Sequence, residues 1–118
     1  MRTSVMTDFF DNWTVQVRKG ILEMCILTAL KDRERYGYDL VKSLVGVPGL
    51  GVTEGTVYPL LSRLRKNGLI TSRLEESSEG PARKYYSLTD EGRDAITSMD
   101  AHLQTLIKGM NTLKRKGT

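Results

Sequence analysis

The chain has few residues of the types that build disulfides, metal sites and acid–base catalysis. Its 118 residues contain one cysteine, Cys25, and one histidine, His102. A single cysteine excludes an intrachain disulfide, and Cys25 lies within the apolar run of residues 21–27. Free cysteine in such a setting is commonly a small, inert core residue, so we favour packing over a redox or nucleophilic role. This use of cysteine fits a reducing cytoplasm.

The scarcity of histidine and of long apolar runs excludes further classes of protein. No paired histidine, glycine-rich phosphate loop or metal-ligand spacing occurs, so we expect a non-enzyme with no cofactor and no metal. The run 21–27 is broken by Glu23 and is far shorter than the roughly 20 apolar residues that span a bilayer. Acidic residues among positions 1–13 stand where a signal peptide has its apolar region. The sequence therefore predicts a cytoplasmic protein without membrane contact.

Charge favours a nucleic-acid partner only weakly. The formal net charge is +4 and the isoelectric point is about 9.3. Residues 53–88 carry 6 Lys and Arg against 4 Asp and Glu, an excess only one unit above that of the segments on either side. Charge alone therefore does not identify the partner. The length favours a single unit with a modest core.

A helix with a free polar face is predicted near the middle of the chain. Thr53 is a good N-cap because its hydroxyl can accept a hydrogen bond from an unpaired amide. Pro59 lacks an amide proton, but Gly55, four residues earlier, tilts at little cost, so this pair predicts a slightly bent helix. Asn67 and Gly68 end the helix. The apolar face holds Val57, Leu60, Leu61 and Leu64, which leaves Thr53, Thr56, Tyr58, Arg63 and Arg65 available to a DNA groove.

A β-hairpin is expected directly after this helix. Residues 69–74 and 83–88 have strand-like composition, and the Ser, Gly and Pro of residues 75–82 favour a turn. Tyr85 and Tyr86 point to opposite sides of their strand, so one of them belongs to the core. The hairpin carries Gly80 and Pro81 at its tip and Arg83 and Lys84 on its return arm, where cations can contact a phosphate backbone or a minor groove.

The remaining N-terminal segments complete a winged helix-turn-helix. Helical spacing predicts a short amphipathic helix with Phe9, Phe10, Trp13 and Val17, then a buried helix around 21–27, and then a helix over 36–45 with Leu40, Val41, Leu44 and Val45 inward. Three glycines in residues 46–52 indicate a turn. The fold class is therefore mostly α with a small β-hairpin, a winged helix-turn-helix plus a long C-terminal helix. We expect residues 1–88 to bind DNA and residues 89–118 to form a dimerisation helix.

The C-terminal segment has a regular apolar seam. Thr89 can cap a helix whose first turn holds Asp90 and Glu91, which the helix dipole favours there. A narrow seam with heptad spacing requires a second helix beside it, so we predict a homodimer. The alternative is that this helix folds back on its own domain, and Gly109 mildly favours that reading. The seam consists of Ile96, Met99, Leu103, Leu106, Met110 and Leu113.

A two-fold symmetric protein of this kind presents two recognition helices to adjacent major grooves and reads a pseudo-palindromic operator in double-stranded DNA. The alternative from a different class is a winged helix that serves only as a protein-interaction module, with incidental basic residues. Salt dependence separates the two, because phosphate contacts weaken steeply as salt rises.

Four blocks of sequence resemble the successive motifs of the PadR family of bacterial transcriptional regulators. They are RKGILEMCILTAL, YGYDLVKSL, TEGTVYPLLSRLRKNGLI and EGPARKYYSLTDEGR. The single short C-terminal helix is similar to the compact subgroup, whose dimers pair through that helix and the N-terminal region. The resemblance implies a dimeric repressor that leaves its operator when a small aromatic or drug-like effector binds.

The resemblance also assigns site residues. The groove-reading positions fall on Thr53, Glu54, Gly55, Thr56 and Tyr58, with Tyr38 in support, and the wing contacts fall on Gly80, Pro81, Arg83 and Lys84.

Two departures from the family pattern matter. The link DRERYGYD is more charged than usual, and the C-terminal helix has no tryptophan on which an effector could stack. Phe9, Phe10 and Trp13 offer aromatic surface instead, although aromatics at helical spacing more often form an interface, and we assign them to the dimer.

Overall fold

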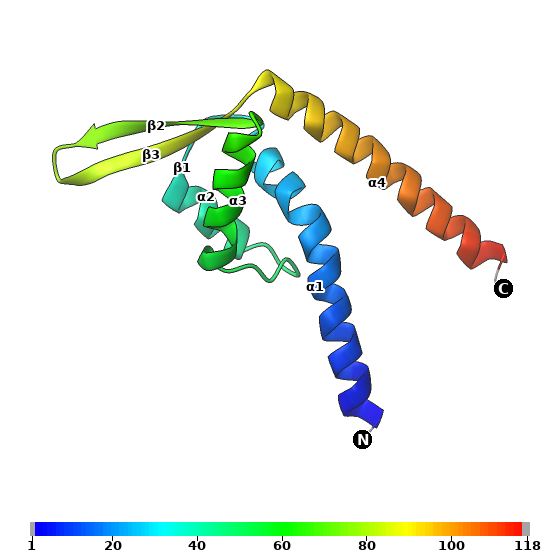
Figure 1. Ribbon diagram of the computed structural model, residues 1–118. Coiled ribbons are helices and arrows are strands. Elements are labelled where there is room, and N and C mark those ends of the chain that lie inside the picture. The colour runs from blue at the N-terminus through cyan, green and yellow to red at the C-terminus, as the bar shows by residue number, and fades with distance from the viewer. Residues whose placement is uncertain (1, 117–118) are drawn as a thin grey trace.

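The computed structural model describes residues 2–116 and confirms a mostly helical fold with a small antiparallel sheet (Figure 1). The helices α1 and α4 project from the winged part as two separate arms, and the hairpin β2–β3 projects from the opposite side (Figure 1). The elements in chain order are α1 (Arg2–Ala29), β1 (Arg35–Tyr36), α2 (Gly37–Val45), α3 (Glu54–Lys66), β2 (Ile70–Ser77), β3 (Gly80–Leu88) and α4 (Asp90–Lys116). None of the described helices is long and apolar enough to cross a membrane.

The sheet contains a strand that the sequence did not reveal. Its order is β1-β3-β2, and both pairings are antiparallel, with Tyr36 opposite Tyr85 in the first and Glu75 opposite Arg83 in the second. The predicted long turn over 75–82 was wrong, because pairing continues to Ser77 and Gly80. The tip is therefore the dipeptide Ser78–Glu79, and Gly80 and Pro81 begin β3 instead of forming the tip.

The core lies where α1, α2 and α3 meet the base of the hairpin. Tyr86 is buried while Tyr85 is half-buried, which confirms that only one of the pair belongs to the core. The prediction for Val45 was wrong: it is 45% exposed, because it lies at the last position of α2, beyond the packed face. The buried side chains include Leu22, Ile26, Leu27, Leu30, Leu40, Val41, Leu44, Val57, Leu61, Leu64, Ile70 and Ile96.

The helix α1 is continuous over 28 residues, so the predicted separate short helix around Phe9–Val17 was wrong. Gly20 does not interrupt it, since a glycine inside a helix costs only about 1 kcal/mol relative to alanine. Phe9, Phe10 and Trp13 lie on the free part of this arm and are 72%, 58% and 55% exposed. They contribute nothing to the core of their own chain.

The start of α4 is fixed to the sheet, whereas its distal part is exposed. The Thr89 hydroxyl accepts a hydrogen bond from the Gly92 amide at 3.0 Å, as the capping prediction required. A Cβ at Gly92 would overlap the Leu69 carbonyl oxygen, so this position needs glycine for close packing. Ile96 is buried and Met99 packs against the core, but beyond Leu103 the seam residues face solvent.

Candidate nucleic-acid interface

The start of α3 exposes polar groups on a fixed backbone. The Thr53 carbonyl accepts hydrogen bonds from the amides of Thr56 and Val57 at 3.1 and 3.2 Å. The predicted capping bond from the Thr53 hydroxyl was wrong, because this hydroxyl lies 3.2 Å from the Thr56 hydroxyl instead of an amide. Two exposed hydroxyls therefore lie together at the start of the helix, beside Glu54. A Cβ at Gly55 would have only the Thr53 hydroxyl within 4 Å, so this surface is open.

The end of α3 follows the prediction from sequence. The helix ends at Lys66, and Gly68 has φ of +77°, a left-handed conformation that favours glycine. The Leu69 amide then donates to the Leu64 carbonyl at 3.0 Å, which turns the chain directly into β2. This turn places the hairpin beside α3.

One flank of α3 faces the hairpin. Burial raises the pKa of Tyr86, Tyr58 raises it further, and Arg65 lowers it, which places both α3 side chains near this strand residue. The Tyr58 ring is 44% exposed. Tyr58 therefore lies on the flank of α3 nearer the hairpin, where its exposed ring is available to a ligand.

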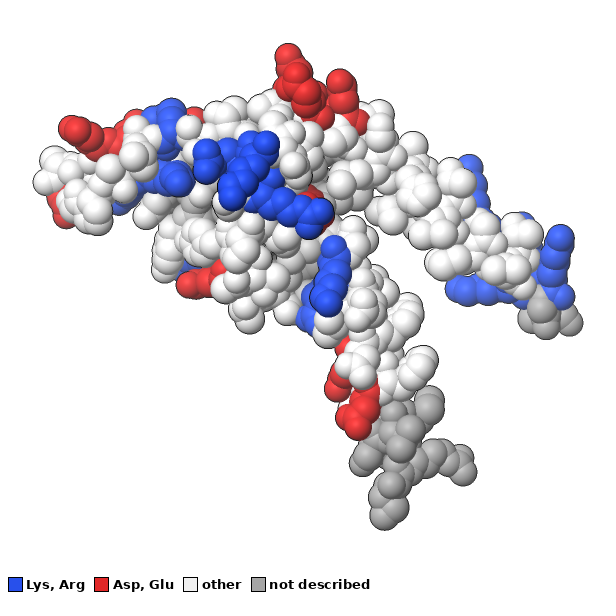
Figure 2. Space-filling view, in the orientation of Figure 1, with Lys and Arg blue, Asp and Glu red and all other residues white. Residues whose placement is uncertain are grey.

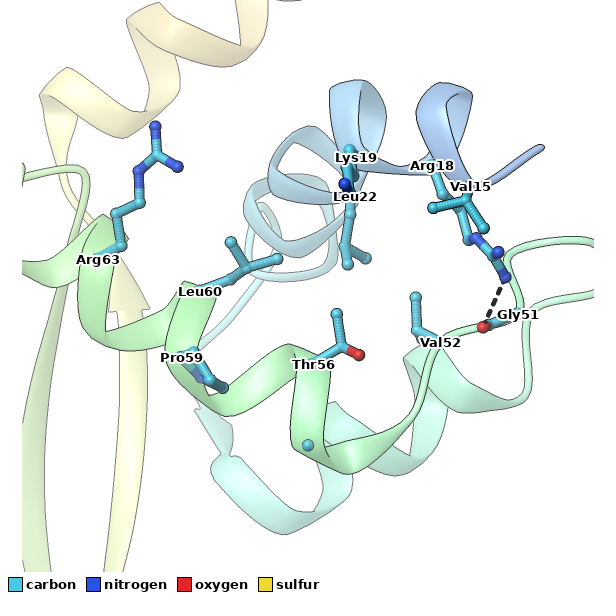
Figure 3. Close-up of a pocket in the computed structure, with 11 residues that line it drawn as sticks. Val15, Arg18, Lys19, Leu22, Gly51, Val52, Thr56, Pro59, Leu60 and Arg63 are labelled. Atoms are coloured by element: carbon cyan, nitrogen blue, oxygen red, sulfur yellow. Dashed lines mark hydrogen bonds between the residues drawn. The ribbon is translucent and has the colours of Figure 1, made fainter. Parts of the chain in front are cut away.

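The other flank of α3 faces α1 across an open groove of about 590 Å³ (Figure 3). Leu22 of α1 and Thr56 and Leu60 of α3 point into the space between the helices (Figure 3). At one end, Arg18 Nη1 donates to the Gly51 carbonyl at 2.8 Å. At the other end, Arg63 Nε lies 3.6 Å from a carboxylate oxygen of Glu23.

These two contacts connect α1 to the loop before α3 and to the second half of α3. Gly51 has φ of +62°, and a Cβ there would overlap the Arg18 guanidinium, so the contact requires glycine at this position. The predicted DNA contact Arg63 consequently lies on the α1 side of the helix, away from the flank that holds Tyr58 and Arg65. Lys19 lines the same groove.

The wing places its two predicted cations on opposite faces. Strand residues alternate in direction, so Arg83 and Lys84 point to different sides of the hairpin. The Arg83 guanidinium lies over the Tyr36 ring, 5.0 Å from its centroid. Lys84 is paired across the strands with Leu74, which is 66% exposed. Only Lys84 therefore lies on the same face of the hairpin as the buried Tyr86.

The outer face of the sheet carries a network of paired charges. Arg73 donates two hydrogen bonds to Glu34, at 2.6 and 2.8 Å, and lies 3.5 Å from Glu75. The Arg73 partner lowers the pKa of Glu34, and Glu34 raises the pKa of Arg73. The Arg73 guanidinium also lies 4.8 Å from the centroid of the Tyr85 ring. This cation is therefore already engaged within the chain.

The predicted supporting residue Tyr38 lies at the start of α2, next to the sheet. Its ring is 49% exposed and lies 6.1 Å from the Tyr36 ring, and the Lys42 ammonium is 5.2 Å from its centroid. Tyr38 and Lys42 thus form an exposed aromatic and cationic edge that a phosphate could contact.

Lysine and arginine gather in a band that runs from the hairpin over α3 to α1 on one face of the molecule (Figure 2). Acidic side chains lie at the tip of the hairpin and near the start of α4 (Figure 2). Arg18 and Lys19 of α1 line the groove beside α3, and sequence reasoning missed both. Their spacing from Val15 and Leu22, three or four residues, is the signal that could have placed them on the face of α1 directed at α3.

Among the described residues, no group of three or more His, Cys, Asp or Glu could hold a metal. Burial raises the pKa of the Cys25 thiol, which disfavours the reactive thiolate.

The chain is similar to several known transcriptional regulators. The chain is 34% identical to a PadR family regulator from Eggerthella lenta (TM-score 0.81, covering 93% of this chain and 96% of that chain). It is 40% identical to a PadR-like regulator from Bacillus cereus (TM-score 0.71, covering 83% and 95%). It is also 32% identical to a transcriptional regulator of Mycobacterium tuberculosis over 93 residues, 79% of this chain and 85% of the relative. These relatives are regulators, not enzymes.

The model of the transcriptional regulator PadR-like family matches residues 26–98, a span that includes α2, α3 and the entire hairpin. The chain therefore belongs to the PadR-like family of transcriptional regulators.

Proposed function

We propose that this regulator is a sequence-specific, homodimeric repressor that a small-molecule effector releases from a pseudo-palindromic operator. The observation that carries the proposal is the exposed polar start of α3 beside a hairpin, on the face that collects lysine and arginine (Figure 2). A helix presented in this way fits a major groove. The residues that read the sequence are Thr53, Glu54, Gly55, Thr56 and Tyr58, with Tyr38 beside them.

The wing supplies contacts to the DNA backbone in this proposal. Gly80 and Pro81 are exposed at the start of β3 and let the strand approach DNA closely. Lys84 provides the cation on the side of the hairpin that faces α3, and Arg83 provides one on the outer side. Backbone contacts of this kind fix the orientation of the protein without reading bases.

The dimer uses the apolar surface that the arms leave exposed. Leu106, Met110 and Leu113 are 50%, 46% and 72% exposed. The side chains of a heptad seam are normally covered by a partner helix, so this exposed apolar surface supports an interface. Ile96 and Met99 serve mainly the core of their own chain. The interface therefore comprises Leu103, Leu106, Met110 and Leu113 together with Phe9, Phe10 and Trp13 of α1.

A second apolar groove gives this seam a place to dock. It has a volume of about 490 Å³, lies between α1 and α2 and reaches Leu103. Its walls include Ile21, Met24, Leu44 and Val47. The seam of α4 from a second copy matches it in chemistry, and α4 begins beside the same α1 arm.

The effector in this proposal is small and aromatic. The Phe10 and Trp13 rings are stacked with centroids 6.1 Å apart and are mostly exposed, so they offer a planar apolar surface. An effector bound between the arms would change the distance between the two recognition helices. That change would lower affinity for an operator of fixed half-site spacing.

Binding to DNA fragments selected from a random pool tests the proposal. We expect selected half-sites about one helical turn apart and affinity that falls steeply with salt, since phosphate contacts release counterions. Substitution of Thr56 or Tyr58 should change the selected sequence as well as the affinity. If the wild-type protein shows no binding to any duplex at low salt, the protein-interaction reading replaces this one.

Sedimentation tests the dimer separately. We expect Leu106→Asp to produce monomers, because it buries a carboxylate in the seam. Gln104→Asp adds the same charge at a neighbouring exposed position outside the seam and should leave the dimer intact. A Leu106→Asp protein that remains dimeric would place the interface elsewhere.

A further inference from the structure

A recognition helix in a major groove has a phosphate backbone on each side. The groove is about 12 Å wide, so both backbones lie within reach of elements that flank the helix. In this protein the hairpin flanks α3 on one side, and α1 flanks it on the other (Figure 1). The hairpin is expected to contact the phosphate backbone of one DNA strand. The surface beside α1 has no assigned contact with the backbone of the other strand.

The groove between α1 and α3 is cationic. Arg18, Lys19 and Arg63 line it, and no Asp or Glu is among its lining residues. The cavity at the tip of the wing differs, because Glu75, Glu76 and Glu79 line it with a single cation, Arg83. A polyanion therefore finds better charge complementarity on the α1 side than at the wing tip.

The three cations of the groove keep donors for a ligand. Lys19 is exposed and pairs with no carboxylate of the residues that the structure describes. Arg18 uses Nη1 for the Gly51 carbonyl, which leaves other N–H groups of its guanidinium. Arg63 contacts Glu23 through Nε at 3.6 Å and is exposed. A phosphate can approach all three from solvent.

The proposed dimer leaves this groove open. With 3.6 residues per turn, Trp13 and Val17 lie on the opposite side of α1 from Val15, Lys19 and Leu22. A second copy that packs on the aromatic side of α1 therefore does not cover the groove. The groove also borders Thr56 and Gly55, so a backbone seated in it lies next to the positions that read bases.

We propose that the groove between α1 and α3 seats the phosphate backbone of the DNA strand opposite the one held by the wing, with Lys19 as the principal contact and Arg18 and Arg63 beside it. The proposal rests on the proposed function, since it assigns a second strand contact to the same DNA complex. It makes α1 a part of the DNA-binding surface as well as of the dimer.

Substitution of Lys19 tests this directly. The probe is a mixed-sequence duplex of about 30 base pairs, long enough for two half-sites one turn apart. Fluorescence anisotropy at several salt concentrations gives the affinity and its salt slope. We expect Lys19→Ala to weaken binding and to reduce the slope by about 0.9 for each phosphate that the protein no longer neutralises, while Lys19→Arg keeps both.

Two further results make the outcome decisive. Lys108→Ala removes the same charge from an exposed position on α4 and should bind like the wild type. Unchanged affinity and slope in Lys19→Ala, with wild-type protein that binds, overturns the groove assignment and leaves the proposed function standing. Equal losses in Lys19→Ala and Lys108→Ala would also overturn it, because they would show a general charge effect. Wild-type protein that binds no duplex removes both proposals.

Discussion

The two flanks of α3 carry similar numbers of cations but differ in their carboxylates. The hairpin of residues 70–88 has three cations and three carboxylates, and two of those cations already contact groups of the same chain. In the groove beside α1, two of three cations, Arg18 and Arg63, likewise contact groups of the same chain, but no carboxylate is among the lining residues. Proximity to the recognition helix therefore does not by itself measure the attraction for DNA. The number of carboxylates that line the same surface is the better guide.

The two flanks also differ in the contacts that hold them in place. On the wing side, Arg73 and Glu34 join β2 to the segment before β1, which holds the sheet together. On the α1 side, Arg18 joins the helix to the loop before α3 through Gly51. An arginine therefore connects each flank to its neighbour, through a carboxylate on the wing side and through a backbone carbonyl on the α1 side.

The largest expected effect comes from Gly51→Ala, which disturbs the contact between Arg18 of α1 and the Gly51 carbonyl. An alanine at φ of +62° costs about 1–2 kcal/mol from the left-handed conformation, and its Cβ also displaces the Arg18 guanidinium. Gly49→Ala is the matched control, because φ is +80° there and nothing lies within 4 Å of its Cβ.

We expect the unfolding free energy of Gly51→Ala to fall by about 1 kcal/mol more than that of Gly49→Ala, because one hydrogen bond contributes about this much. We also expect Gly51→Ala to bind the duplex more weakly. Urea unfolding and anisotropy measure the two effects. Equal stability losses in the two variants would mean that the Arg18 contact contributes nothing.

Loss of the wing cations should have the next largest effect. We expect the combined Arg83→Ala and Lys84→Ala variant to weaken binding across sequences and to flatten the salt slope. The single variants sharpen the comparison of flanks, since Arg83 is engaged with Tyr36 and Lys84 lies on the α3 side of the hairpin. Lys84→Ala alone should reproduce most of the change in slope. A larger change from Arg83→Ala would place the outer face of the wing against DNA.

Neutralising the carboxylates at the wing tip should have a smaller effect of opposite sign. Glu75, Glu76 and Glu79 repel a phosphate backbone, so we expect their combined change to Gln to raise affinity for the duplex and steepen its salt slope. Anisotropy at low salt measures the gain. Asp90→Gln with Glu91→Gln, at the start of α4, is the control and should leave affinity unchanged. A loss of affinity in the wing variant would show that these carboxylates contact bases or support the wing.

Local chemistry explains which elements the sequence could predict. The cap at Thr89 and the stop at Gly68 depend on bonds between residues close in sequence, and both are present. The periodic apolar faces of α3 and α4 likewise follow from spacing alone. By contrast, β1 has two residues and becomes a strand only because β3 lies beside it, so no local pattern predicts it.

The candidate site was harder to predict where it depends on tertiary packing. Arg18 and Lys19 are distant from α3 in sequence, and only the crossing of the helices brings them beside Thr56. The same crossing turns Arg63 toward Glu23, although its exposed position on the helix had indicated a free cation. Spacing identifies which residues share a face, but it does not identify what that face meets.

The smallest expected effect concerns the paired charges of the outer wing. Arg73 lowers the pKa of Glu34 from its ordinary value of 4.5, so the ionised carboxylate stabilises the folded protein. This stabilisation is fully present above pH 4.5 and is lost as the pH falls through the lowered pKa. We therefore expect Glu34→Gln to unfold at a lower urea concentration than the wild type at neutral pH, with a difference that disappears in acid.

Glu76→Gln is the charge-matched control, since Glu76 is exposed and has no ion pair among the described residues. The difference in unfolding urea concentration between Glu76→Gln and the wild type should therefore stay constant as Glu34 becomes protonated. A Glu34→Gln difference that persists below the pKa of the wild-type carboxyl would show that the hydrogen-bond geometry, and not the charge of Glu34, holds Arg73 in place. In that case Arg73 would stay engaged at every pH and would not be available to DNA.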